Sequence, residues 1–323
     1  MTQPPVDPGA ALQTQLVNAM LKDKKSERFW KNLRTFSFIA LGTLYAAGAY
    51  FGGAADPDGA PVDAKGKTAP YVSVVRITGE IGADKDASAE RLNPLLVKAF
   101  SDTQAKGVVL VMNSPGGTPV QASLIHDRLV QLRAEHKKKV VVVAEDMLTS
   151  GAYLIAVGAD KIVVNRSTVA GSVGVISHGF GFTGLMEKVG VERRTLQAGT
   201  NKNRLDPFGP SNPEDRAKME MLLGEIHKHF IDTVKAGRKG KLKAEDAALF
   251  NGDFWAGDQA VQLGLVDEVS DLPTVLDKEF GVKKQREYAS SRSLWERISK
   301  TVSAEVATAI TAQTSSQILL MPR

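Results

Sequence analysis

Ser150 is the residue whose type and setting could do chemistry. It stands in the run Thr149-Ser150-Gly151, between a strand predicted at 139–144 and an apolar segment at 153–157 that is typical of a helix. A strand, a turn of small residues and a helix together expose one hydroxyl at the start of the helix. The positive end of the helix dipole favours developing negative charge there, as a nucleophile requires. The same setting also fits a serine that only caps the helix.

A glycine pair could supply the second component of such a site. Residues 113–117 read Asn-Ser-Pro-Gly-Gly and follow a predicted strand. The glycines, Gly116 and Gly117, leave their backbone amides unshielded, and two such amides can bind the oxyanion that forms during acyl transfer. A tight Pro-Gly turn without a catalytic role is the structural alternative.

Two further polar segments hold candidate residues. Ser172 lies in the small-residue run 170–174, where it could hydrogen-bond a catalytic base or serve only the turn. Lys202 lies in the polar segment 198–207, after a glycine. On chemistry alone, a lysine in such a segment reads as a solvated surface charge.

The elements that must position these residues alternate between strands and helices. This alternation predicts an α/β class with a mostly parallel sheet. We expect strands at 71–77, 107–112, 140–145, 161–164 and 191–196. We expect four helices, one at 88–101, one at 120–136, one that begins directly after Ser150, and one at 213–235.

The composition of the 323 residues limits the class of protein. A hydrophobic content of 43% and a charged content of 24% are ordinary for a globular chain. The absence of cysteine excludes a disulfide scaffold, a cysteine metal site and a thiol nucleophile. The net charge is +5, but no basic stripe with interleaved aromatic residues indicates nucleic-acid binding. Phosphate-cradling and zinc-ligand spacings are absent, so we expect no cofactor and no metal.

The N-terminal region predicts a membrane anchor. Residues 1–34 carry six Lys or Arg against three acids, and residues 35–53 carry no charge. At about 1.5 Å per residue, the uncharged stretch reaches about 28 Å, close to the thickness of the hydrocarbon core of a bilayer. The basic flank predicts a cytoplasmic N-terminus and an extracytoplasmic globular part, in a single-pass protein of the inner (plasma) membrane. A cleavable signal peptide, cut near residues 52–55, is the competing interpretation.

The order of the motifs resembles the signal peptide peptidase A family in its short single-pass form, over about residues 71–280. The chain differs from the usual family pattern at Asn201 and at Asp253. The segments that carry the resemblance are Asn-Ser-Pro-Gly-Gly at 113–117, Ser-Gly-Ala-Tyr at 150–153, Gly-Ala-Asp-Lys-Ile at 158–162, Gly-Ser-Val-Gly-Val at 171–175, Gly-x-x-Lys at 199–202, and the late block at 251–267.

The resemblance implies a serine peptidase of the Clp protease/crotonase fold that uses a Ser/Lys dyad. The roles that it implies are Ser150 as nucleophile, Lys202 as general base, Ser172 as the residue that orients this base, and the backbone amides of Gly151 and of Gly117 or Gly116 as the oxyanion hole. With this fold, the expected organisation is a basic cytoplasmic segment at 1–34, a transmembrane helix at 35–53, a linker at 54–70, a peptidase domain at 71–284 and a C-terminal tail at 285–323.

The resemblance also implies partners. It indicates signal peptides or other hydrophobic, membrane-proximal peptides as substrates, and a ring-like homo-oligomer in which one subunit's groove is completed by its neighbour. Two other functions remain open from the residues. The first is a Ser/His mechanism that uses His178 with Asp206. The second is a catalytically silent membrane scaffold or a crotonase-like protein that binds acyl-CoA, since paired glycines also suit a thioester oxyanion.

Overall fold

The computed structural model describes residues 31–38, 42, 61 and 69–289. The chain divides into two compact units, Met1–Gly59 and Ala60–Arg323. In the first unit, residues 31–38 are helical. Among the described residues, no helix is long and apolar enough to cross a membrane. Most of the transmembrane helix predicted at 35–53, most of the linker and most of the tail predicted at 285–323 lie outside these residues, so they stay predictions.

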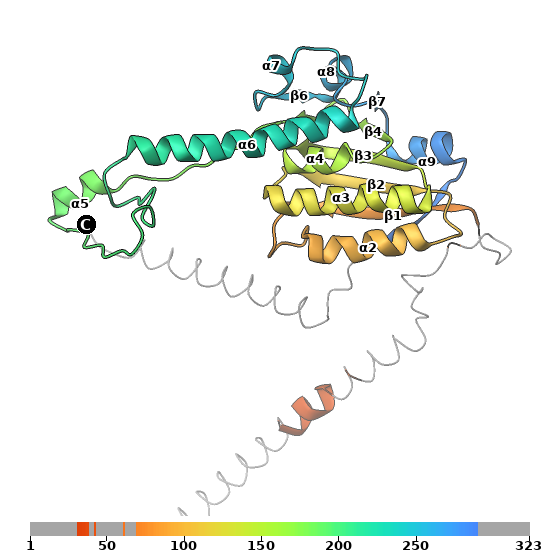
Figure 1. Cartoon of the computed structure of the whole chain (residues 1–323). Coiled ribbons are helices and arrows are strands. Elements are labelled where there is room, and N and C mark those ends of the chain that lie inside the picture. Colours follow the sequence, from red (N-terminus) through yellow and green to blue (C-terminus); the bar gives the residue numbers. More distant parts are fainter. Residues whose placement is uncertain (1–30, 39–41, 43–60, 62–68, 290–323) are drawn as a thin grey trace, which may run out of the picture. The chain divides into compact units, whose positions relative to one another are not determined.

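The second unit contains one large sheet (Figure 1). Its strand order is β6-β5-β3-β2-β1-β8, and β4 pairs with both β3 and β7. All these pairs are parallel except β5 with β6. The strands of the described part are β1 (Tyr71–Thr78), β2 (Val108–Ser114), β3 (Val140–Thr149), β4 (Lys161–Val164), β5 (Val169–Gly171), β6 (Phe254–Ala256), β7 (Glu268–Val269) and β8 (Lys284–Tyr288).

Helices follow most of the strands, as expected for parallel connections. They are α2 (Ala89–Ser101), α3 (Pro119–His136), α4 (Gly151–Ala156), α5 (Thr183–Val189), α6 (Pro213–Gly237), α7 (Asp246–Leu249), α8 (Gly257–Gln262) and α9 (Leu272–Phe280). The predicted α/β class is therefore confirmed.

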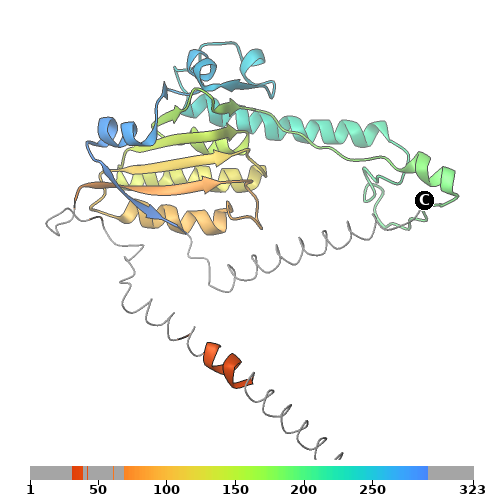
Figure 2. The same ribbon diagram turned by 180° about the vertical axis from the view of Figure 1, so that it is seen from behind.

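Both faces of the central strands are buried, which explains their nearly continuous valine runs. Successive residues of β1 show this, because their side chains point to opposite faces of the sheet. Val75 packs in the cluster that includes α2, α3 and α4, whereas Val74 packs in the cluster that includes Val275 of α9. Figure 1 shows α2 and α3 against one face, and Figure 2 shows the sheet from behind.

Strand β3 leads directly to the candidate nucleophile. The two halves of this strand pair with different neighbouring strands. Residues 141–143 pair with β4, whereas residues 147–149 pair with β5. The chain then turns at Ser150 into α4, at the carboxyl end of β3. In parallel α/β sheets, this end of the strands is where ligand sites form.

A long segment that includes α5 lies between β5 and α6. We call residues 176–212 of this segment the arm. We predicted a strand at 191–196, and this is wrong, since none of these residues is in a strand. They are all exposed, and Leu196 is 100% exposed. A strand needs a neighbour to pair its backbone, and none lies beside this segment in the described part of the chain.

Candidate active site

Ser150 occupies a strained backbone conformation, with φ 52° and ψ −125°. A positive φ is costly for a residue with a Cβ and occurs where surrounding contacts enforce it. Here the Ser150 N–H donates to the Gly171 carbonyl oxygen at 2.8 Å, and the Ser150 carbonyl oxygen accepts from the Leu154 N–H at 3.0 Å. The side chain makes no capping bond to α4. The sharp turn therefore presents the hydroxyl rather than using it as a helix cap.

The glycine pair lies directly beside this turn, and close packing explains why both positions are glycine. A Cβ on Gly116 would lie 2.8 Å from the Cβ of Ser150, and a Cβ on Gly117 would lie 1.9 Å from the carbonyl oxygen of Ile81. A side chain at Gly116 or Gly117 would therefore prevent the backbone from approaching the Ser150 turn and Ile81 this closely.

Hydrogen bonds distinguish the two candidate oxyanion donors. The Gly116 N–H donates to Ser114 Oγ at 3.2 Å, so it is already used. Around Gly117, the Ile81 N–H donates to the Gly116 carbonyl oxygen at 2.8 Å and the Thr118 N–H donates to the Ile81 carbonyl oxygen at 2.9 Å. In such a parallel bridge, the N–H of the central residue points away from its partner. The Gly117 N–H therefore points away from Ile81.

The Gly117 amide lies close to the first residue of α4. A Cβ built on Gly151 would lie 3.4 Å from the Gly117 nitrogen. Within residues 69–289, neither the Gly117 N–H nor the Gly151 N–H donates a hydrogen bond. These two donors flank Ser150, and the geometry favours them over Gly116 as the oxyanion hole.

Ser172 directly follows β5, as Ser150 directly follows β3. Thr149 pairs with Gly171 in the parallel register, so Ser150 and Ser172 follow at neighbouring positions. Ser172 also has a positive φ, 53°, and its N–H donates to the Asp253 carbonyl oxygen at 2.7 Å. The sequence therefore located five residues that the fold brings together, namely Gly116, Gly117, Ser150, Gly151 and Ser172.

A small cavity opens beside Ser150, with a volume of about 120 Å³. Sequence reasoning missed its wall on α6, which consists of Ile226, His229 and Phe230. Their spacing of three and four residues is the signal of a single helix face. The cavity is otherwise largely apolar, with Pro119, Leu154 and Val175 among the residues that line it.

Lys202 lies elsewhere, in the arm. Its side chain is exposed, and within the described part of the chain it makes no hydrogen bond with Ser150. Figures 1 and 2 show α5 and the adjoining loops of the arm beyond the first turn of α6, at the end of that helix opposite the sheet. The role of Lys202 stays a prediction.

The arm is held by contacts within itself and by an ion pair to α6. Within the arm, Arg193 pairs with Asp206 at 2.8 Å, and the rings of Phe182 and Phe208 stack with centroids 5.4 Å apart. Arg204 of the arm pairs with Asp215 of α6 at 3.3 Å. The arm is thus a folded extension.

The alternative base, His178, is also exposed in the arm. Its proposed partner is engaged otherwise, because the Asp206 carboxylate pairs with Arg193 at 2.8 Å. A hydrogen bond from the Phe208 N–H, together with Arg193, holds the pKa of Asp206 below its usual range. The structure therefore does not assemble a pair of His178 and Asp206.

Several known proteins resemble this chain in sequence. Residues 133–284 match the profile of peptidase family S49. The chain is 33% identical over 207 residues to the putative protease slr0021 of Synechocystis, which covers 64% of this chain and 72% of that protein. The chain belongs to peptidase family S49, the signal peptide peptidase A family.

Two other relatives match this chain over a smaller share of their own length. A protein of Brucella melitensis named Na(+)/H(+) antiporter NhaA is 48% identical over 189 residues, which is 58% of this chain and 26% of that protein. The putative protease MJ0651 of Methanocaldococcus jannaschii is 33% identical over 184 residues, or 57% of this chain and 58% of that protein. The chain thus spans about a quarter of the Brucella relative, so it shares one region of that protein.

The region that matches the S49 profile includes Ser150, Ser172 and Lys202, whereas Gly116 and Gly117 precede this region. The glycine turn is joined to the matched region by the fold, through its contact with Ser150. The structural neighbourhood of the nucleophile therefore extends beyond the profile match.

Proposed function

We propose that this S49 chain is a membrane-anchored serine endopeptidase of the Clp protease/crotonase fold, with Ser150 as nucleophile and Lys202 as general base. One observation carries the proposal. Ser150 is held at a positive φ between two backbone donors, Gly117 and Gly151. A helix cap does not require this conformation, whereas an exposed nucleophile at a sharp turn does.

The geometry supports an acyl-enzyme route. The Ser150 Oγ attacks the peptide carbonyl carbon while its proton passes to the base. The carbonyl oxygen becomes an oxyanion between the N–H groups of Gly117 and Gly151, which stabilise it by several kcal/mol. The base then returns the proton to the leaving amine, and the C–N bond breaks. Water then attacks the carbonyl carbon of the ester while one of its protons passes to the base. The base gives that proton to the Ser150 Oγ as the C–O bond of the ester breaks.

The position of Lys202 supports a site shared between two copies of the chain. A lysine amine accepts a proton only when it is uncharged, and removal from water favours that form. An exposed lysine on an arm meets this condition when the arm packs against another molecule. The arm exposes apolar side chains suited to such a contact, including Ile176 (83%), Phe180 (77%) and Val189 (62%). We propose that Lys202 of one copy serves Ser150 of another in a ring-like homo-oligomer.

The proposed substrates are apolar peptides near a membrane surface, such as signal peptides. The apolar cavity beside Ser150 suits an aliphatic side chain next to the cleaved bond. The predicted span at 35–53 would place the peptidase domain on the extracytoplasmic side of the inner membrane.

The test uses the full chain in detergent with a quenched apolar peptide. We expect Ser150→Ala and Lys202→Ala to be inactive and His178→Ala to remain active. Co-expression of Ser150→Ala with Lys202→Ala chains should restore activity, because mixed oligomers contain sites with both wild-type residues. Activity in Ser150→Ala equal to that of the wild type would refute the peptidase proposal and favour a silent scaffold. Failure of co-expression to restore activity would place the dyad within one chain.

A further inference from the structure

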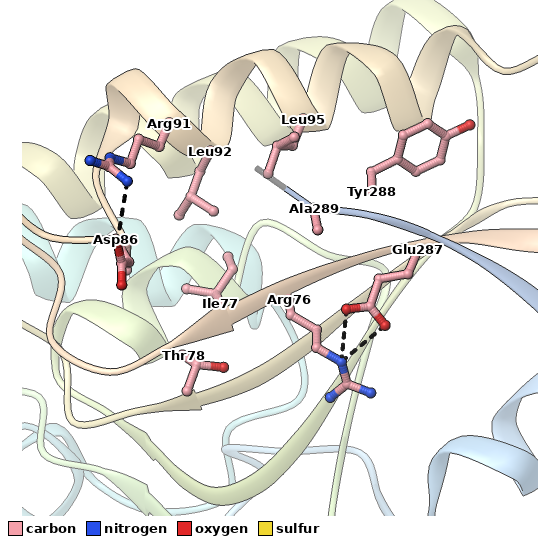
Figure 3. Close-up of a pocket in the computed structure, with 11 residues that line it drawn as sticks. Arg76, Ile77, Thr78, Asp86, Arg91, Leu92, Leu95, Glu287, Tyr288 and Ala289 are labelled. Carbon is pink, nitrogen blue, oxygen red and sulfur yellow. Dashed lines mark hydrogen bonds and ion pairs between the residues drawn. The ribbon is translucent and has the colours of Figure 1, made fainter. Parts of the chain in front are cut away.

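A second cavity lies away from Ser150, between α2 and the end of β1 (Figure 3). It has a volume of about 290 Å³, and we call it the β1 groove. Its floor is apolar and consists of Ile77 from β1 and of Leu92 and Leu95 from α2. Tyr288 and Ala289, at the end of β8, close one side of it.

Strand β1 continues past its partner at this groove. The register of β8 on β1 ends with Tyr288 opposite Val75, three residues before β1 ends at Thr78. The bonds to β2 show how the remaining residues point, since the Ser73 and Gly79 N–H groups both donate toward β2. Backbone donors alternate along a strand, so the Thr78 N–H points to the β8 side.

The backbone N–H of Thr78 therefore faces a position beside β1 that β8 does not reach. Within residues 69–289, the Thr78 N–H donates no hydrogen bond. A free strand edge of this kind pairs readily with an extended peptide.

The position and direction of β8 identify the occupant. Ala289 itself lines the groove, and residues 290–323 follow it in the chain. Since β8 runs parallel to β1, its direct continuation passes along the unpaired end of β1. We propose that Ser290–Arg292 dock in the β1 groove as an extension of β8, with residue 290 opposite Ile77 and residue 292 opposite Gly79.

Charge at the rim agrees with this register. Ile77 and Tyr288 belong to the same core cluster, on the α2 side of the sheet. Side chains of a strand alternate between faces, so Arg292 falls on the same side as Tyr288. The Asp86 carboxylate lies at that rim, 3.3 Å from the Arg91 guanidinium, and a carboxylate can accept from a second guanidinium.

Docking at this edge would act on the candidate oxyanion hole through Ile81. The Gly82 N–H donates to the carbonyl oxygen of Ala87, which lines the groove, at 3.3 Å. The adjoining Ile81 donates to the Gly116 carbonyl oxygen at 2.8 Å and accepts from Thr118. A tail segment that fixes this loop would therefore also fix Gly117. This consequence rests on the proposed peptidase function, whereas the docking itself does not.

Hydrogen–deuterium exchange of the full chain tests the docking. Thr78→Pro removes the free N–H without removing a bond to β2, and Thr78→Ala is the matched control that keeps the N–H. In this register the N–H groups of residues 290 and 292 face β1, so we expect slow exchange at these two amides in the wild type and in Thr78→Ala, and at least tenfold faster exchange in Thr78→Pro. Unchanged exchange in β2 and β3 would show that each variant is folded.

Other outcomes would overturn the inference. Equally fast exchange at residues 290 and 292 in all three proteins would show that the tail does not dock. Protection that appears only as the protein concentration rises would assign the groove to the tail of a second copy.

If docking steadies Gly117, Thr78→Pro lowers kcat severalfold with KM unchanged. An inactive wild type would sink the peptidase proposal and leave the exchange result intact.

Discussion

The N–H of Ser150 donates to the carbonyl oxygen of Gly171 at 2.8 Å, which ties the turn after β3 to the end of β5. Both residues have a positive φ, 52° for Ser150 and 106° for Gly171. A Cβ on Gly171 would lie 2.7 Å from the ring of Trp255, so only glycine fits there. The late segment that holds Trp255 therefore supports the turn of the nucleophile, although it lies about a hundred residues away in the sequence.

Replacement of Ser150 by glycine should raise stability and abolish activity. Relief of strain at a positive φ gives about 1–3 kcal/mol, and the added freedom of the unfolded chain removes about 0.5–1 kcal/mol. We therefore expect Ser150→Gly to unfold at a free energy about 1 kcal/mol higher than Ser150→Ala, which keeps the Cβ. Urea denaturation of the two inactive variants makes the comparison. Equal stability would mean that the turn is not strained.

Replacement of Gly117 by alanine should remove one oxyanion donor. The new Cβ would lie 1.9 Å from the Ile81 carbonyl oxygen, so the backbone must move. Loss of one such donor lowers kcat by about 10²–10³. Steady-state kinetics on an apolar peptide measures this. A suitable control is Gly224→Ala, because a Cβ on Gly224 of α6 meets nothing within 4 Å. A normal kcat in Gly117→Ala would remove Gly117 from the site.

The sequence predicted the β1–β2–β3 layout and the positions of Ser150 and Gly117, because each depends on a local pattern of valines and glycines. It did not predict the wall formed by Ile226 and Phe230, since that contact joins α6 to α4 across the fold. It also predicted a strand at 191–196, where no partner strand exists in the described structure. Local patterns specify an element, but its neighbours depend on the whole chain.

The ion pair of Arg238 and Asp267 should make stability fall in acid. Their Nη1 and Oδ2 atoms lie 2.7 Å apart, and Arg238 is 2% exposed. Burial acts to raise the pKa of Asp267, but hydrogen bonds, chiefly from Arg238, outweigh it and lower this pKa below 3.8. The stabilisation is therefore complete above the unfolded pKa of about 3.9 and is lost as the pH falls through the lower, folded value.

Urea denaturation of Asp267→Asn against pH tests this ion pair. The loss of a buried partner costs about 3–5 kcal/mol, and we expect a deficit of this size at pH 7 that shrinks below pH 4. The exposed Asp232→Asn on α6 serves as the control. A deficit that is the same at all pH values would show that the charge of Asp267 contributes nothing.

The cavity beside Ser150 should select the size of the substrate side chain. Ile226 forms part of its wall, and the volume is only about 120 Å³. Ile226→Phe would fill much of this space. We expect kcat/KM for a peptide with leucine at the cleaved bond to fall at least tenfold, and that for alanine to change less than twofold, since one or two methylenes in a pocket are worth about 10–200-fold. The control is Leu222→Phe, one turn away on α6 and 46% exposed. Equal losses for both peptides would mean that Ile226 supports the fold of the site and not its choice of substrate.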